Sequence, residues 1–114
     1  MEKVVIEWDH GIRHFAGRED LYIKYFNRFL EDKHFYDAKE AFEKKDMISF
    51  KREIHSLKGL AGTLGLMDVF WHAFAVSNVA DVVDAKQIEE KIKTLETAYQ
   101  LTCMEIEEKI KRIQ

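Results

Sequence analysis

Residues 46–65 read DMISFKREIHSLKGLAGTLG, and the spacing of their apolar side chains decides the fold. Apolar residues recur there at steps of three and four, at Met47, Phe50, Ile54, Leu57, Ala61 and Leu64. Such a stripe predicts an amphipathic helix that buries one face. Asp46 is a favoured N-cap and Gly65 a favoured terminator, so we expect one helix over residues 47–64.

The same spacing extends outward along the chain. A short N-terminal helix is expected over Gly11 to Phe15, with Asp9 as its N-cap and Gly17 as its terminator. Further stripes predict one long helix with a possible bend over residues 19–45, another over 69–83 and a last one over 88–113. Narrow stripes that repeat near 3.5 residues are typical of antiparallel bundle helices.

We therefore predict an all-α fold, an antiparallel four-helix bundle with a short extra N-terminal helix. The bundle would occupy residues 18–114 and the N-terminal segment residues 1–17 of a single domain, 1–114. The absence of proline favours long helices over many short strands.

Composition excludes several classes of function. The chain has 114 residues, 46% of them hydrophobic, and a net charge of −3 with both signs interspersed, so it lacks the basic footprint of a nucleic-acid-binding protein. Its single cysteine, Cys103, cannot close an internal disulfide. The polar N-terminus does not resemble a signal peptide, and no apolar run is long enough to span a bilayer. We expect a cytoplasmic monomer that binds neither nucleic acid nor membrane.

The helix over residues 47–64 carries one anomaly. At about 100° per residue, His55 points away from the core stripe, with Gly59 and Gly62 on its own face and Lys58 beside it. Each helical glycine costs about 0.8–1 kcal/mol relative to alanine, and no packing on a solvent face offsets that cost. Bare backbone beside a histidine suggests that another molecule approaches closely there.

The chemistry of these side chains fits phosphoryl transfer. An exposed imidazole is largely neutral at cellular pH and can attack phosphorus. Lys58 would meet the phosphoryl oxygens as a mobile charge, while Lys51 and Arg52 would add weaker, screened attraction. The spacing alone fits equally well a surface histidine on a charged face with incidental glycines.

Residues 55–65, HSLKGLAGTLG, resemble the signature of histidine phosphotransfer (HPt) domains, H-x-[LI]-K-G-x-[AS]-x-x-[LI]-G, at every defined position. Upstream, residues 11–13, Leu21-Tyr22 and Phe29 resemble the pattern that precedes the bundle in that family. The resemblance implies a phosphorelay intermediate of two-component signal transduction. Such a protein accepts a phosphoryl group from a receiver-domain aspartate and passes it to another receiver aspartate.

The resemblance also implies a role for each matching residue. His55 would be phosphorylated through Nε2, Lys58 would stabilise the phosphoryl oxygens, and Gly59 would give clearance to the partner, with Gly62 on the same face. The family often places a glutamine on the following helix, where this chain has Ser77, or Asn78 next to it.

The expected partners are response-regulator receiver domains and a hybrid sensor histidine kinase. The family's docking surface corresponds here to Ile12, Phe15, Leu21, Tyr25 and Leu60. The chain has no P-loop or Gly-rich nucleotide loop, so we expect a phosphocarrier rather than an enzyme, with no cofactor of its own. Mg²⁺ would come with the receiver.

Several alternatives remain open at this level. The chain could be the phosphate-accepting domain of a chemotaxis-type histidine kinase, or a helical adaptor that works without phosphate. His10 and His14 are spaced to share a metal ion but lack a third ligand at motif spacing, so we expect no metal site. Residues 69–76 are apolar nearly all round, which fits a deeply packed helix or a surface for a partner or a second copy.

Overall fold

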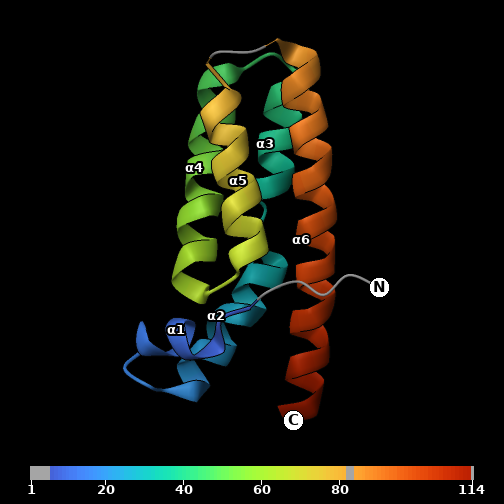
Figure 1. Cartoon of the computed structure of the whole chain (residues 1–114). Helices are drawn as coiled ribbons and strands as arrows, with labels where there is room; N and C mark the ends of the chain where they lie inside the picture. The colour runs from blue at the N-terminus through green and yellow to red at the C-terminus, as the bar shows by residue number, and fades with distance from the viewer. Residues whose placement is uncertain (1–5, 82–83, 114) are drawn as a thin grey trace.

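The computed structural model describes residues 6–81 and 84–113, and these residues form six helices (Figure 1). Their bounds are α1 Trp8–Arg13, α2 Glu19–Glu31, α3 His34–Glu43, α4 Met47–Leu64, α5 Met67–Val79 and α6 Ala85–Ile113. The predicted all-α class is confirmed.

Helices α3, α4, α5 and α6 lie side by side and run alternately up and down in Figure 1. Each packs against the next along the chain. Side chains also join α3 to α6, because the rings of Phe35 and Tyr99 stack 4.9 Å apart and Lys39 pairs with Glu96 at 3.2 Å. Helices α1 and α2 lie at the end of the molecule where α4 finishes (Figure 1).

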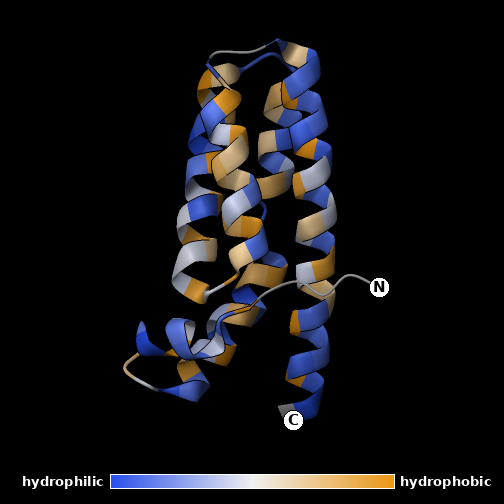
Figure 2. Ribbon diagram, viewed as in Figure 1, coloured by the Kyte–Doolittle hydropathy of each residue, from blue (hydrophilic) through white to orange (hydrophobic). Residues whose placement is uncertain are grey.

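The predicted stripes form the core. Along α6 in Figure 2, hydrophobic patches alternate with hydrophilic ones, as expected for a helix with one buried face. The fully buried large side chains come from every helix except α1, and include Phe29, Phe35, Phe50, Leu57, Val76 and Leu95. Two residues of the stripes, Val83 and the side chain of Ile113, lie outside the described residues.

Both predicted ends of α4 are confirmed. The Asp46 carboxylate accepts a hydrogen bond of 3.1 Å from the Ser49 N–H. Hydrogen bonds from the Ser49 side chain and backbone lower the pKa of Asp46. Gly65 ends the helix with φ +78°, in the left-handed region that favours glycine.

The prediction of one long helix over residues 19–45 is wrong, because the chain breaks between α2 and α3. Asp32 is extended, with φ −67° and ψ 144°, and its carboxylate accepts a 3.0 Å hydrogen bond from the His34 N–H. A short acidic side chain that bonds to nearby backbone competes with helix continuation. His34 also contacts Glu53 of α4 at 2.6 Å, which fastens the start of α3 to its neighbour.

The predicted start of the N-terminal helix is also wrong. Helix α1 begins at Trp8, so Asp9 lies inside its first turn instead of capping it. The cap position is Glu7, whose N–H donates to the Gly65 carbonyl at 2.8 Å. This long-range backbone contact, which the local sequence does not reveal, sets the start. Gly17 has φ +74° in the turn that follows α1.

Gly11 allows α1 to lie against the end of α4. A Cβ there would collide with the Tyr22 hydroxyl and the Leu64 carbonyl. The Tyr22 hydroxyl donates a 2.6 Å hydrogen bond to that carbonyl, and burial raises the pKa of Tyr22. Gly11, which is part of the upstream pattern, therefore serves packing.

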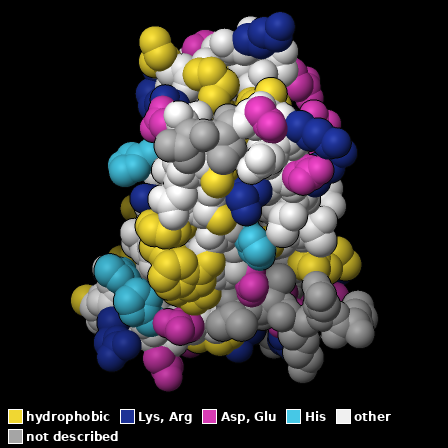
Figure 3. Space-filling view, turned by 45° about the horizontal axis from the view of Figure 1, so that its top comes forward, with side chains coloured by type: hydrophobic (Ala, Val, Ile, Leu, Met, Phe, Trp, Pro, Cys, Tyr) yellow, Lys and Arg dark blue, Asp and Glu magenta, His cyan; other side chains and the backbone are white. Residues whose placement is uncertain are grey.

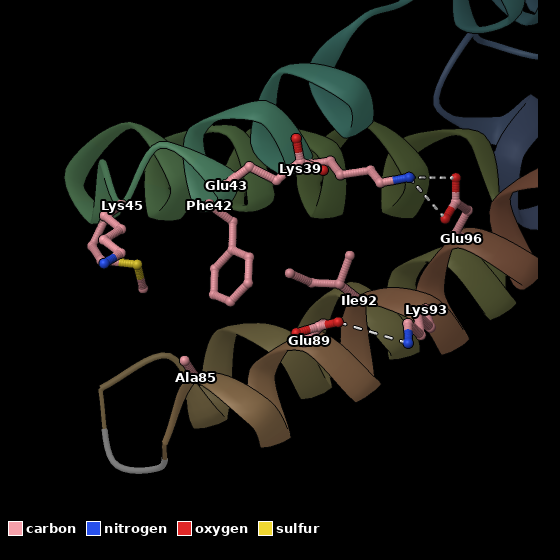
Figure 4. A pocket seen from close by; sticks show the side chains of 10 residues that line it. Lys39, Phe42, Glu43, Lys45, Ala85, Glu89, Ile92, Lys93 and Glu96 are labelled. Carbon is pink, nitrogen blue, oxygen red and sulfur yellow. Dashed lines mark hydrogen bonds and ion pairs between the residues drawn. The ribbon is translucent and has the colours of Figure 1, made fainter.

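A cavity of about 570 Å³ lies between α3 and α6 (Figure 4). Phe42 and Ile92 point into it from the two helices. Two ion pairs lie at its rim, Lys39 with Glu96 at 3.2 Å and Lys93 with Glu89 at 3.7 Å. The cavity lies on the α3–α6 side of the molecule, whereas α4 and α5 form another side.

Across residues 6–81 and 84–113, no helix is both long and apolar enough to cross a membrane.

Thr102 of α6 offers a test of the core. Its hydroxyl is buried and has no hydrogen-bond partner among the described residues. Because a buried hydroxyl without a partner is unfavourable, Thr102→Val should raise the free energy of unfolding by about 1 kcal/mol, as measured by urea denaturation. Thr97→Val is the control, since that exposed hydroxyl bonds to the Lys93 carbonyl and its loss brings no gain. A less stable Thr102→Val protein would contradict this account of the core.

Candidate functional site

The site is built on the exposed side of α4. Ile54 and Leu57 are buried, and this orientation leaves His55 exposed between them. No hydrogen bond or ion pair within the described part of the chain involves His55. The predicted outward-facing imidazole is therefore present, and its ring nitrogens are available to a ligand.

The two glycines of this face have different surroundings. A Cβ built on Gly59 meets nothing within 4 Å, so the predicted empty surface exists there. At Gly62 a Cβ would lie 3.2 and 3.3 Å from two ring carbons of Phe70. The expectation that no neighbouring helix packs against both glycines is wrong for Gly62, because the Phe70 ring of α5 occupies that space.

Lys58 lies on the side of the site that faces α5. It is half-buried, and its Nζ is 5.5 Å from the centroid of the Phe74 ring. A cation at this distance is attracted to the face of an aromatic ring. The ammonium group is thus held one helical turn beyond His55 without an anionic partner among the described residues.

Three contacts fix the register between α4 and α5, and they join Lys51 to Asp81, Lys58 to Phe74 and Gly62 to Phe70. From Lys51 to Gly62 the residue numbers rise along α4, while those of their partners fall from Asp81 to Phe70, so the two helices are antiparallel. Ser77 therefore lies opposite His55, since each is four residues from the ion pair of Lys51 and Asp81. Ser77 and its neighbour Asn78 are both exposed.

The five residues assigned to receiver docking are all half-buried: Ile12, Phe15, Leu21, Tyr25 and Leu60. Phe15 and Tyr25 lie together, with ring centroids 4.9 Å apart, and the Arg28 guanidinium sits 4.9 Å over the Tyr25 ring. Leu60 lies five residues after His55 and thus about 140° from it around α4. The structure groups Phe15 with Tyr25 but turns Leu60 away from the imidazole.

Helix α5 presents a surface that the sequence interpretation left open. Its buried residues are Val69, Ala73 and Val76, whereas the Trp71 side chain is 56% exposed and the Phe74 side chain 39% exposed. Of the two alternatives for residues 69–76, the deeply packed helix is wrong, because one side of α5 is exposed. Periodicity could have shown it, because Trp71 lies about 160° from the mean direction of the buried stripe.

Phe70, Trp71 and Phe74 form what we call the aromatic face of α5. The ring centroids of Trp71 lie 5.0 Å from Phe70 and 5.7 Å from Phe74. Phe70 covers Gly62 and Phe74 contacts Lys58, so this face adjoins the site on α4. Figure 3 shows exposed hydrophobic side chains (yellow) gathered on this side of the molecule, with histidines (cyan) around them.

The other histidines are placed differently. The rings of His10 and His14 lie 5.1 Å apart on α1 and the turn after it, and both are exposed. Within residues 6–81 and 84–113, no group of three or more His, Cys, Asp or Glu side chains is arranged to hold a metal ion. Burial raises the pKa of the Cys103 thiol to about 11, which keeps it protonated.

Comparisons of the chain with family models, with curated proteins and with solved structures find no match. The resemblance to HPt domains therefore rests on residues 55–65, on the upstream pattern and on the geometry of α4.

These groups define what the site can do chemically. An exposed imidazole without a partner is a nucleophile, and the ammonium of Lys58 can accompany a negatively charged group that reaches it. The open surface at Gly59 admits a bulky partner. The arrangement suits transfer of a phosphoryl group carried by another macromolecule.

The glycines give a test of this geometry. Gly59→Ala should raise the free energy of unfolding by about 0.8–1 kcal/mol, because alanine favours the helix and its methyl group meets nothing. Gly62→Ala should gain less, since the Phe70 ring must move. Urea denaturation of both variants measures the difference, and destabilisation by Gly59→Ala would show that this glycine is needed for packing.

Proposed function

We propose that this chain is an HPt protein, a phosphorelay intermediate that carries a phosphoryl group on His55 between receiver domains. The observation that carries the proposal is the exposed, unpartnered imidazole of His55 beside open backbone at Gly59. A histidine with only a structural role would not require a neighbouring helical glycine whose missing side chain leaves open space.

The transfer step follows from the chemistry of these groups. The Nε2 lone pair of His55 attacks the phosphorus of an aspartyl phosphate, and the bond from phosphorus to the aspartate oxygen breaks. The aspartate leaves as a carboxylate, and the phosphorylated ring keeps its proton on Nδ1 until solvent removes it. In the reverse step Nδ1 takes a proton back from solvent, a carboxylate oxygen of a second receiver's aspartate attacks the phosphorus, and the bond from phosphorus to Nε2 breaks to leave the neutral imidazole.

Lys58 supports this step through charge. Its ammonium lies over the Phe74 ring, an attraction worth only about 0.5–1 kcal/mol at an exposed site. A dianionic phosphoryl group on His55 would be a stronger partner, since hydrogen bonds to charged groups are worth about 1.5–3 kcal/mol. The flexible lysine chain can therefore turn from the ring to the phosphoryl oxygens.

The proposal includes the architecture of the family. Helices α3 to α6 would be its antiparallel four-helix bundle in a single domain, with α1 as the short extra helix. The protein would work in the cytoplasm as a monomer, without kinase activity of its own. A hybrid sensor kinase would supply the phosphate, and the receivers would bring Mg²⁺ and the acidic pocket that binds it.

Gly59 indicates that a partner approaches α4 beside His55. A chain without such a partner would gain about 0.8–1 kcal/mol of helix stability by replacing Gly59, because nothing fills the space beside it. A phosphate-independent adaptor could use the same clearance, but it would have no use for the ammonium of Lys58 next to the imidazole.

The direct test is transfer of label from a phosphorylated receiver domain. The wild-type chain should acquire phosphate that is labile in acid and stable in base, and His55→Gln should abolish this labelling. His10→Gln is the matched control, because His10 is also an exposed helical histidine. Label that persists in His55→Gln would place the phosphorylated residue elsewhere.

Lys58 has its own test. Lys58→Ala should slow transfer to His55 about tenfold, through the loss of a charged hydrogen bond to the phosphoryl group. Lys51→Ala is the control, since Lys51 is one turn before His55 but is paired with Asp81. Rapid-quench kinetics measure both variants, and equal rates in Lys58→Ala and wild type would remove the role of this lysine.

A further inference from the structure

Within the aromatic face of α5, Phe70 packs over Gly62 and Phe74 contacts Lys58, but no packing role accounts for the exposure of Trp71. Val69, Ala73 and Val76 already bury the opposite side of that helix. Trp71 is 56% exposed, although a large apolar ring of this kind gains most when it is covered. Exposed aromatic rings gathered next to a reactive side chain mark a surface for a partner.

We propose that the receiver domain docks on the aromatic face of α5, with Trp71 as the central anchor of the contact. This inference rests on the proposed function and names the surface that its partner uses. It differs from the surface implied by the family resemblance, which lies on α1, α2 and Leu60.

The aromatic face lies close enough to His55 for the same partner to cover both. The aspartyl phosphate must reach Nε2 of His55, so the docked receiver surrounds that atom. A standard interface covers about 800 Å² on each partner, which corresponds to a radius of roughly 16 Å. Ser77 lies opposite His55, and Trp71 is six residues from Ser77, or about 9 Å along α5. The aromatic face therefore falls within the footprint.

The aromatic face is also more available to a partner than the surface implied by the family resemblance. Phe15 and Tyr25 pack against each other and against the core, and Leu60 is turned about 140° from His55. Trp71 and Phe74 are more exposed and lie on the side of α4 that holds Lys58. A receiver gains more apolar burial on this side of the imidazole.

The charges around His55 also suit a receiver. Lys58 has no anionic partner among the described residues, whereas Arg52 is paired with Glu53 at 3.7 Å. Asp81, just beyond the end of α5, is paired with Lys51. This leaves the Lys58 ammonium beside His55 to meet the acidic pocket that a receiver uses to hold Mg²⁺.

A second copy of the chain is a poorer occupant. A symmetric dimer through the aromatic face would cover the surface next to His55 and block the transfer that the site supports. A docked receiver would cover the apolar rings and, at the same time, present its phosphoryl group to His55.

The experiment separates docking from chemistry by using two phosphoryl donors. The first is phosphoramidate, a small molecule that reaches His55 without a protein interface. The second is a receiver domain found, by screening the purified receivers of the same genome, to phosphorylate the wild-type chain. Trp71→Ala should raise KM for this receiver at least tenfold, as expected for an anchor residue. Its rate with phosphoramidate should stay within twofold of wild type.

Tyr36→Ala is the matched control, because Tyr36 is an aromatic residue 49% exposed on the α3–α6 side. It should leave both rates unchanged. Trp71→Gln provides a second variant with a polar side chain, and thermal unfolding checks that each variant is folded. Light scattering of the wild-type chain and Trp71→Ala reports their oligomeric states.

The outcomes are distinct. An unchanged KM in Trp71→Ala and Trp71→Gln overturns the docking surface, as does an equal loss with both donors, which would mean that Trp71 acts on His55 itself. A wild-type dimer that Trp71→Ala dissociates without changing KM would assign the face to a second copy. If neither donor labels His55 in the wild-type chain, the proposed function fails, and the docking surface with it.

Discussion

The site depends on the packing of the Phe70 ring against Gly62. Because residue 62 has no side chain, the Phe70 ring of α5 lies 3.2 and 3.3 Å from the place that a Cβ would take. Together with the contacts of Lys58 with Phe74 and of Lys51 with Asp81, this packing defines the register of the two helices. Ser77 then lies opposite His55. A large side chain at position 62 would need the space that the Phe70 ring occupies.

Gly59 and Gly62 lie one turn apart on α4, but only Gly62 has a neighbouring side chain in the space that a Cβ would take. Gly62 gives up helix propensity and regains stability through contact with Phe70. Gly59 gives up the same propensity and regains nothing within the described residues. Natural proteins keep such locally unfavourable residues mainly where function needs them. The stability that Gly59 forgoes is therefore the clearest sign of a partner.

The sequence predicted those features that local spacing controls. The buried stripes of α4, α5 and α6, the Asp46 cap and the Gly65 terminator all follow from periodicity and side-chain chemistry. The start of α1 did not, because it depends on Gly65, a residue far along the chain. The break at Asp32 was missed although its signal is local, a short acidic side chain that bonds to the His34 N–H, while the contact of His34 with Glu53 adds a long-range part. The packing of Phe70 on Gly62 likewise required the register of two helices, which periodicity within one helix cannot supply.

Three departures from the surface of a stable, isolated monomer coincide on one side of the molecule. His55 is unpartnered among the described residues, Gly59 leaves bare backbone, and Trp71 exposes a large ring. Each departure has a different physical origin, in hydrogen bonding, in helix propensity and in hydrophobic burial. On the α3–α6 side, Lys39 is paired with Glu96 and Lys93 with Glu89. A single cause accounts for all three at once, namely a second macromolecule that covers the ring, uses the clearance and brings the imidazole its ligand.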